Sequence, residues 1–272
     1  MMDDNVYMLK IGGSVITDLS RPNTAKLDEI SRILSEIKEA MSKSDFKLII
    51  GHGSGSFGHI SAAKYNVQNG LINEGSRRGA ALTHLVATDL NTLFIKQGLE
   101  MNMDLYPFSP AGFGIGSNRE LQSGFTDHMR FALENGFIPV VHGDVIMDYM
   151  QGVSISSTED VLRFVSKNIK PSKVFFCTDV DGVYDKPPNE NPNARLIKQI
   201  DSSNINDVIK NTDVSKNRVD VTGGMKTKIS LLYGICRDTD ATGYIFNVHK
   251  SGVLAKILSG NVSGLEFTTV NR

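Results

Sequence analysis

The glycine-rich stretch at residues 51–59 constrains the fold of this chain more than any other part of the sequence. It follows the apolar run 46–50, which has the length and bulk of a buried strand, and it leads into residues 60–65, which can begin a helix. Four glycines in nine residues allow a sharp backbone turn and a close approach of N–H groups to an anion at a helix start. The alternative is a strand-to-helix turn that binds nothing, and this stretch alone leaves both interpretations open.

Strand-like and helix-like segments alternate along the rest of the chain, which predicts the α/β class. Apolar runs predict strands at residues 6–16 (interrupted at the glycines 12 and 13), 46–50, the start of 104–118, 137–145, 172–178, 244–248 and 265–270. Helical spacing predicts helices at residues 24–44, 74–99, 125–135, from 157 onward and 221–237. Such alternation implies an αβα sandwich with a mostly parallel open sheet, whose ligands gather at the carboxyl ends of the strands. No repeat or linker interrupts residues 1–272, so a single domain is expected.

The charge balance and the cysteines narrow the classes of function. Lysine and arginine total 29 against 30 aspartates and glutamates, which argues against a surface for nucleic acid or anionic membranes. Cys177 and Cys236 lie far apart and are interpreted as buried thiols of a reducing compartment, not as a disulfide or a metal site. The N-terminus has no signal-peptide pattern, and no stretch approaches the roughly 20 apolar residues that span a bilayer. We therefore expect a soluble cytoplasmic protein.

Two further glycine-rich segments carry a lysine. Lys10 lies in an apolar strand just before residues 12–14, and burying its ammonium is costly unless the ammonium meets an anion. The alternative for Lys10 is an edge strand that leaves the ammonium in water. The glycines 223 and 224 precede Lys228 at the expected start of a helix. Together with residues 51–59, these segments indicate more than one bound phosphate.

Two well-known nucleotide-binding motifs do not fit this chain. There is no G-x-x-x-x-G-K-[ST] run, so the chain is not a P-loop protein. Residues 53–58 do match G-x-G-x-x-G, but the acid about 20 residues on, Glu74, opens a helix instead of ending a second strand. No nucleophile elbow supports Ser-His-Asp hydrolysis. A different phosphate-binding fold is therefore indicated.

Acidic residues lie at the end of one predicted strand and at the start of one predicted helix. Asp144 lies at the end of the strand 137–145 and is interpreted either as a ligand contact or as a turn aspartate. Ser157 with Asp160 three residues later fits the capping-box pattern. Glu159 and Asp160 are accordingly interpreted as residues that cap a helix and complement its dipole.

Six segments, taken in order, resemble motifs of the amino acid kinase family. They are residues 9–17, 55–59, 77–83, 139–145, 178–184 and 220–225, the last followed by Lys228. The run 55–59 is the one most particular to the branch that holds isopentenyl phosphate and fosfomycin kinases. The resemblance covers nearly the whole chain, and it implies an ATP-dependent small-molecule kinase on an open αβα sandwich.

The resemblance also implies where the substrates bind. The acceptor would bind mainly to a lobe of about residues 1–150 and Mg-ATP to a lobe of about residues 151–272, in a homodimer. The residues predicted for ATP are Lys10, Gly12, Gly13, Ser14, Thr178, Asp179, Tyr184, Gly223 and Lys228. Those predicted for the phosphorylated acceptor, by resemblance or by their position after strands, are Gly53, Gly55, Ser56, Gly58, His59, Asp144, Ser157 and Thr158. Lys10, His59 and Lys228 are the expected catalytic residues, ATP and Mg²⁺ are the expected cofactors, and no metal ligand is assigned.

Three departures from the family pattern concern the acceptor. Leu19 follows a Thr-Asp pair where these kinases usually carry a lysine, and Arg21 is the nearest cation. Thr158-Glu159 stands where they have Gly-Asp, and Lys226 adds a cation to the last motif. The leading prediction is phosphorylation of isopentenyl phosphate to isopentenyl diphosphate in an archaeal-type mevalonate pathway.

The sequence leaves three alternatives to this acceptor and this class of function. The first is mevalonate 3-phosphate, phosphorylated on its 5-hydroxyl with His59 as the general base. The second is a phosphonate such as fosfomycin. The third is a nucleotide-binding regulator without catalysis, since a fold does not determine a function.

Overall fold

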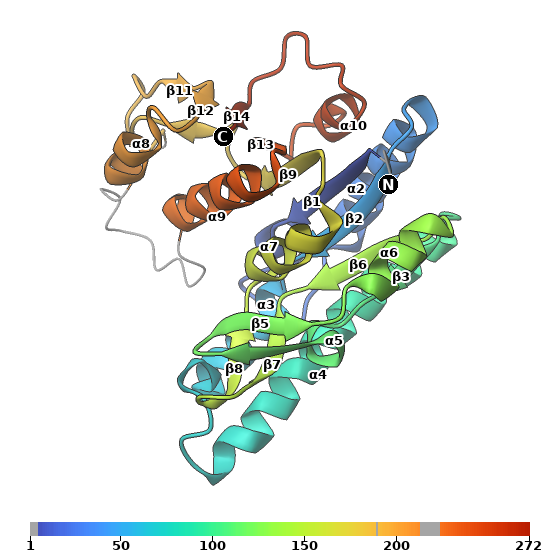
Figure 1. The fold of residues 1–272 in the computed structure, drawn as a ribbon, viewed down its shortest axis with the longest axis vertical. Coiled ribbons are helices and arrows are strands. Elements are labelled where there is room, and N and C mark those ends of the chain that lie inside the picture. Colours follow the sequence, from blue (N-terminus) through green and yellow to red (C-terminus); the bar gives the residue numbers. More distant parts are fainter. Residues whose placement is uncertain (1–4, 189, 213–223) are drawn as a thin grey trace.

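The computed structural model describes residues 5–188, 190–212 and 224–272, and its centre is an eight-stranded sheet (Figure 1). Neighbouring strands are parallel, except for the antiparallel pair β13 and β14. In sheet order the strands are β12 (Gln199–Ile200), β14 (Thr268–Val270), β13 (Thr242–Asn247), β9 (Lys173–Thr178), β1 (Val6–Ile11), β2 (Lys47–His52), β6 (Ile138–His142) and β3 (Leu105–Pro107). The predicted α/β class with a mostly parallel sheet is confirmed.

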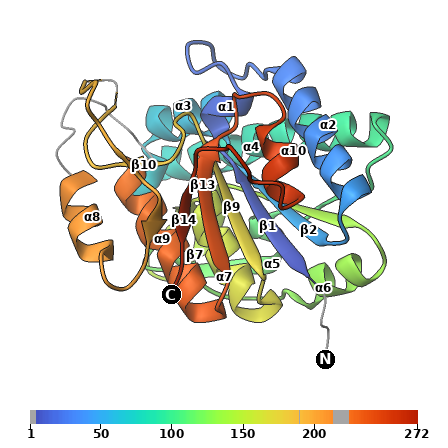
Figure 2. The same ribbon diagram turned by 90° about the horizontal axis from the view of Figure 1, so that it is seen from above.

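Helices cover both faces of this sheet, as Figure 2 shows from above. One face carries α2 (Leu27–Lys43), α4 (Glu74–Glu100) and α10 (Val253–Leu258), and the other carries α6 (Asp127–Glu134), α7 (Thr158–Ile169), α8 (Ile205–Thr212) and α9 (Gly224–Thr239). Successive side chains of a strand point to opposite faces. Leu9 and Ile50 accordingly pack into the first core, while Met8 and Ile49 pack into the second.

A second sheet of four strands lies beside the main one, and the sequence did not predict it. Its order is β5 (Glu120–Gly124), β4 (Gly114–Ser117), β7 (Asp144–Asp148) and β8 (Gly152–Ser156). Only Gly143 separates β6 from β7, so the predicted strand 137–145 does not end in a polar tip but continues into this sheet. Its strands are only four or five residues long, and β4 and β5 hold mostly glycine and polar residues, so they lack the apolar pattern that predicts a strand. A short helix, α5 (Pro110–Phe113), precedes β4, and β10 (Val183–Tyr184) pairs separately with β11 (Leu196–Ile197).

Two predicted boundaries at the glycine-rich segments were wrong. The strand expected over residues 6–16 ends at Ile11, and α1 (Gly13–Ile16) is a single helical turn. The helix expected to begin near residue 60 is α3 (Gly55–Tyr65), followed by the 3-10 turn η1 (Val67–Asn69). Both glycine segments therefore supply the first turn of a helix directly after a buried parallel strand.

The structure also shows the surroundings of the two cysteines and the character of the helices. Cys177 and Cys236 are free and buried, as expected. Among the described ranges, none of the helices combines the length and the apolar character needed to cross a bilayer.

Candidate active site

Lys10 and Glu159 form a buried ion pair at the carboxyl end of β1. Lys10 is 5% exposed, and its Nζ lies 2.8 Å from Glu159 Oε1 in the first turn of α7. Burial alone would raise the pKa of Glu159, but the charge and hydrogen bond of Lys10 outweigh burial and hold that pKa below its usual value. The sequence argument that Lys10 needs an anion was correct, and within the protein that anion is a carboxylate.

Glu159 is thus a site residue that the sequence reasoning missed. Its position in the first turn of a helix led to its interpretation as a cap, but Ser157 and Asp160 make the cap without it. Asp160 N donates to Ser157 Oγ over 3.1 Å, and Ser157 Oγ donates to the Asp160 carboxylate over 2.6 Å. Burial raises the pKa of Asp160. The only sign of Glu159's role in the sequence was the unmatched charge of Lys10.

Lys228 joins this pair from α9. Its positive charge contributes to the lowered pKa of Glu159, so its ammonium lies within electrostatic range of that carboxylate. Lys228 is half-buried in the first turns of α9, where the sequence had placed it at a helix start. Of the three predicted catalytic residues, Lys10 thus contacts Glu159 directly, and Lys228 acts on the same carboxylate through its charge. Gly223, which was predicted beside Lys228, lies outside the described residues.

The two N-terminal glycine segments pack directly against each other. A Cβ on Gly53 would lie 2.7 Å from Gly13 N, and a Cβ on Gly13 would overlap the backbone of Gly55. Gly55 itself has a φ of +48°, a conformation that disfavours any side chain. Three of the predicted phosphate-binding glycines therefore permit a backbone-to-backbone contact between the loops that follow β1 and β2.

Thr17 connects the same two loops through its hydroxyl. Thr17 Oγ1 donates to Gly13 O over 2.7 Å and accepts from Ser56 N over 3.0 Å. Thr17 is fully buried, although it lies in a polar stretch of the sequence. The sequence reasoning gave it no role, because its two partners lie in different loops.

Gly12, Gly58 and His59 differ from these packed glycines. A Cβ on Gly12 would meet its nearest neighbour, Val15 Cγ2, at 3.5 Å, an ordinary contact distance, so no protein group requires a glycine there. A Cβ on Gly58 would overlap Ser54 at the start of α3. His59 is half-buried in the second turn of α3. Ser14, also predicted to bind ATP, is exposed in the first turn of α1.

Thr158 connects the start of α7 to the end of β2. Its Oγ1 donates to His52 O over 2.8 Å, and His52 O also accepts from Gly143 N over 3.2 Å. The hydroxyl of Thr158 therefore has a backbone partner at the strand end from which the loop 53–55 leaves. Thr158 therefore connects α7 to β2 through a side-chain hydrogen bond that a glycine could not make.

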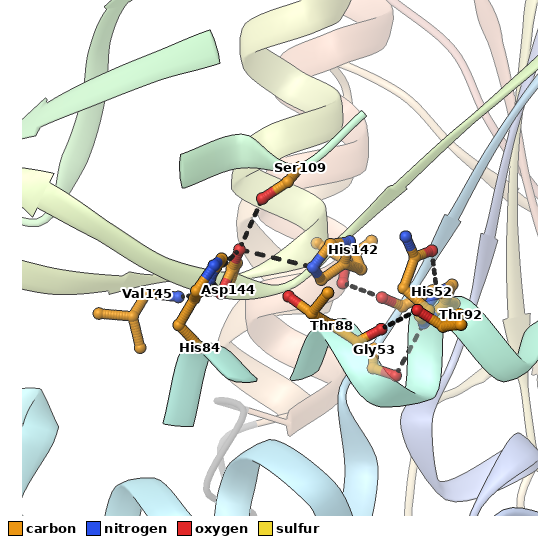
Figure 3. Close-up of polar contacts among 11 residues, drawn as sticks. His52, Gly53, His84, Thr88, Thr92, Ser109, His142, Asp144 and Val145 are labelled. Atoms are coloured by element: carbon orange, nitrogen blue, oxygen red, sulfur yellow. Dashed lines mark hydrogen bonds and ion pairs between the residues drawn. The ribbon is translucent and has the colours of Figure 1, made fainter. Parts of the chain in front are cut away.

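Asp144 lies in a cluster of histidines at the junction of the two sheets (Figure 3). Its side chain is fully buried, accepts from His84 Nδ1 at 2.9 Å and from Ser109 Oγ at 3.0 Å, and lies 3.4 Å from His142 Nε2. Burial alone would raise the pKa of Asp144, but His142 and His84 outweigh it and lower that pKa. The hydrogen bond to Asp144 in turn raises the pKa of His84.

His52 extends this cluster toward the glycine loop. Its ring lies 5.7 Å from that of His142, and its Nε2 lies 3.0 Å from Asn91 Oδ1 of α4. Burial, with a smaller contribution from His142, lowers the pKa of His52 to about 4, so the ring is neutral at physiological pH. Of these residues the sequence reasoning singled out only Asp144, because a histidine in an apolar run does not show which face it occupies.

The residues predicted for the nucleotide lie at the ends of β9 and β10. Thr178 Oγ1 is within 2.8 Å of Val180 O and 3.1 Å of Phe246 O, which fixes the turn after β9. Asp179 is exposed, and Tyr184 is half-buried on β10. This turn lies beside the end of β1, because β9 and β1 are neighbours in the sheet.

Comparison with known proteins agrees with this geometry. Residues 5–247 match the amino acid kinase family. The isopentenyl phosphate kinase of Methanocaldococcus jannaschii is 31% identical over 95% of this chain and 97% of its own length, and that of Methanothermobacter thermautotrophicus is 34% identical over 97% and 99%. An X-ray structure of isopentenyl phosphate kinase superposes on 98% of this chain and 100% of its own, with a TM-score of 0.83 and 30% identity. The UMP kinase of Ureaplasma parvum, 14% identical with a TM-score of 0.65, shares the fold.

Proposed function

This chain belongs to the amino acid kinase family, and on that premise we propose that it phosphorylates isopentenyl phosphate with ATP to give isopentenyl diphosphate, in an archaeal-type mevalonate pathway. The observation that carries the proposal is the buried ion pair of Lys10 and Glu159 at the carboxyl edge of the sheet, to which Lys228 adds a second positive charge. Two lysines around one buried carboxylate, next to two glycine loops, suit a reaction that moves negative charge between phosphates.

In the proposed reaction an oxygen of the acceptor phosphate forms a bond to the γ-phosphorus of ATP. The bond from that phosphorus to the β–γ bridging oxygen breaks, and ADP leaves. Lys10 and Lys228 stabilise the charge that develops on the transferring group, and Gly12, Gly13 and Ser14 offer N–H groups at the start of α1. Glu159 is a positioning residue, since it holds the Lys10 ammonium at 2.8 Å before the substrates arrive.

The acceptor phosphate is proposed to bind at the start of α3. This helix has 11 residues, and its first N–H groups and its dipole favour an anion. Gly53, Gly55, Ser56 and Gly58 form this helix start, and His59 donates to the phosphate from the next turn. The lobe of about residues 1–150 would thus hold the acceptor. Leu19, in place of the usual lysine, is 57% exposed and leaves the charge stabilisation to Lys10 and Lys228.

ATP is proposed to bind to the lobe of about residues 151–272, near Thr178, Asp179, Tyr184 and Lys228, with Mg²⁺. Magnesium coordinates phosphate oxygens and needs at most one or two protein carboxylates. Within the described part of the chain, no three side chains of His, Cys, Asp or Glu come together as a metal site. The proposal therefore assigns the metal to the nucleotide phosphates and names no protein ligand. A homodimer, expected from the family, and a cytoplasmic location, which suits two free thiols, complete the proposal.

A product assay tests this function. The purified protein is incubated with Mg-ATP and isopentenyl phosphate, and ³¹P NMR should show a new diphosphate ester together with ADP. Mevalonate 3-phosphate and fosfomycin are assayed in parallel as the alternative acceptors. No product above background with any acceptor would overturn the proposed activity, and product with only one of the alternatives would replace the acceptor.

A further inference from the structure

Buried polar atoms without a hydrogen-bond partner gather next to the glycine loop. Among the described residues they include Thr88 Oγ1 of α4, Nδ1 of His142 at the end of β6, and Ser156 Oγ at the end of β8, whereas Nε2 of His142 faces Asp144 at 3.4 Å. The side chains of His142 and Ser156 are fully buried. An unpaired buried polar group is destabilising, so several at one place indicate a partner that is not part of the protein.

Four elements bring these atoms together. His142 lies opposite His52 in the parallel pair of β6 and β2, and Asp144 lies opposite Ser156 in the antiparallel pair of β7 and β8. Residues that are opposite on neighbouring strands place their side chains on the same face. Thr88 follows His84 by one helical turn, and His84 binds Asp144. Figure 3 shows Thr88 beside His142, with His84 and Asp144 adjacent.

This polar cluster of Thr88, His142 and Ser156 adjoins the loop proposed to hold the acceptor phosphate. His52 is the last residue of β2 and is followed directly by Gly53, the first residue of that loop. The rings of His52 and His142 are 5.7 Å apart, so His142 lies beside the start of the loop. A small acceptor whose phosphate binds at α3 would therefore extend its carbon chain toward Thr88, His142 and Ser156.

The side chains of this polar cluster favour an acceptor that carries a neutral hydroxyl over one that carries a carboxylate. A hydroxyl both donates and accepts, which matches the free ring nitrogen of His142 and the hydroxyls of Thr88 and Ser156. A carboxylate on the ligand would instead face the buried Asp144, which lies 3.4 Å from His142 and whose pKa is lowered. Like charges at such a distance repel strongly where water is excluded.

We propose that this polar cluster binds a hydroxyl group, so that the kinase also phosphorylates phosphate monoesters whose carbon chain carries a hydroxyl a few bonds from the phosphate. The inference rests on the proposed function, because it uses the same donor, the same phosphoryl site and the same bond changes. It adds a second class of acceptor to isopentenyl phosphate. The kinase is expected to prefer the hydroxylated acceptor to isopentenyl phosphate, because a site with buried polar groups loses affinity for a ligand that cannot pair with them.

The test compares two acceptors that share one carbon skeleton. The first is isopentenyl phosphate. The second is its hydroxylated analogue, in which water has been added across the alkene so that the branched carbon carries a hydroxyl. We expect the analogue to be phosphorylated with a kcat/KM at least equal to that of isopentenyl phosphate. In Thr88→Val, which removes a hydroxyl without changing the side-chain shape, the ratio of the two kcat/KM values should fall about tenfold.

Thr92→Val is the matched control, because Thr92 lies one turn further along α4, is exposed, and donates to Thr88 O. Its acceptor ratio should equal that of the wild type. If only isopentenyl phosphate reacts, the polar cluster binds water alone. The same follows if the ratio of the two kcat/KM values is equal in Thr88→Val and in the wild type. Either result overturns the inference while the proposed function stands. If only the analogue reacts, the inference is supported and the proposed acceptor is overturned. If neither reacts, both fail.

A further analogue that carries a carboxylate beside the hydroxyl tests the argument from charge. It should react more slowly than the analogue with the hydroxyl alone, because Asp144 repels it. Faster turnover of the carboxylated compound would contradict the assignment of a neutral ligand group.

Discussion

Glu159 and Asp144 are both buried carboxylates near the carboxyl edge of the main sheet, but their surroundings differ. Glu159 is paired with the ammonium of Lys10 at 2.8 Å, and Lys228 adds a second positive charge. Asp144 instead contacts two imidazoles and accepts a hydrogen bond from a serine hydroxyl. The first arrangement suits a site that must hold phosphate charge, and the second suits a site that recognises a polar but neutral group.

The glycine loop after β2 lies between these two regions. In the sheet, β2 separates β1, which carries Lys10, from β6, which carries His142. The loop contacts the first region through Gly13 and adjoins the second through His52. A ligand bound at the start of α3 is therefore placed where one end can meet the lysines and the other the histidines.

The largest expected effect comes from removing the fixed charge of the first region. Lys10→Met should reduce kcat by about 100-fold or more, because it removes a group that stabilises transferring charge. It should also lower the free energy of unfolding by about 3–5 kcal/mol, because Glu159 is left buried without a counter-charge. Turnover by the product assay and urea denaturation measure the two effects.

A double variant separates these effects. Lys10→Met combined with Glu159→Gln removes both charges and should recover most of the lost stability, but none of the lost turnover. Unchanged ATP consumption in either variant would show that Lys10 does not take part in the transfer.

The second prediction concerns His52 and the acid stability of the histidine region. Its pKa of about 4 lies below its usual value of 6.5, so between these pH values the unfolded chain binds a proton that the folded chain does not. Stability therefore falls as the pH falls from 6.5 to about 4, by about 3 kcal/mol in total. His52→Gln, whose amide can still donate to Asn91, should remove this part of the pH dependence. The free energy of unfolding is measured by urea denaturation at pH 7 and pH 4.5. If it falls by the same amount in the wild type and in His52→Gln, the prediction is contradicted.

The third prediction tests the loop between the regions. Gly55→Ala places a Cβ at a φ of +48° and against Thr17 Oγ1, and should cost about 1–3 kcal/mol of stability. Gly12→Ala is the matched control, since a Cβ there meets Val15 at an ordinary 3.5 Å and the stability should change by less than about 0.5 kcal/mol. The control should instead raise the KM for ATP. Equal thermal stability of the two variants would show that the contact between the loops is not needed.

The smallest expected effect belongs to His84. Its pKa is raised by Asp144, so the pair adds stability below pH 6.5, and this contribution is lost as the pH rises through the raised pKa. His84→Ala should therefore be less stable than the wild type mainly at acidic pH, by less than about 1 kcal/mol, because the His84 side chain is 41% exposed. In an NMR titration, Asp144→Asn should return the pKa of His84 toward 6.5. No change in that titration would exclude the pair as the cause.

The main sheet was predictable because its strands are buried on both faces and stand out as apolar runs. Residues 46–50 and 172–178 correspond closely to β2 and β9. The second sheet was not predictable by the same rule, because β4 consists mainly of glycine and serine, and β8 buries its serines while its Ile155 is exposed. The turn at Gly13–Ile16 was taken as strand because its apolar residues continue the preceding run.

The residues of the candidate site also divide into those with a local signal in the sequence and those without one. Lys10 and Lys228 were found because a lysine beside glycines is conspicuous in a sequence, and the structure brings both near Glu159. Thr17 and His142 were missed, because their importance depends on partners in loops and strands that are distant in the sequence. No local pattern marks a side chain whose partner belongs to another element.

The sequence alone determined the order of most main-sheet strands and of the long helices, the glycine-rich segments between strand and helix, and the resemblance to the amino acid kinase family. These follow from local rules, since periodicity and backbone freedom act over a few residues. The tertiary structure decided that Glu159 pairs with Lys10 and that Asp144 is enclosed by His84, His142 and Ser109. The reason is that sheet order and strand register determine which side chains share a face, and these are set by packing across the whole molecule.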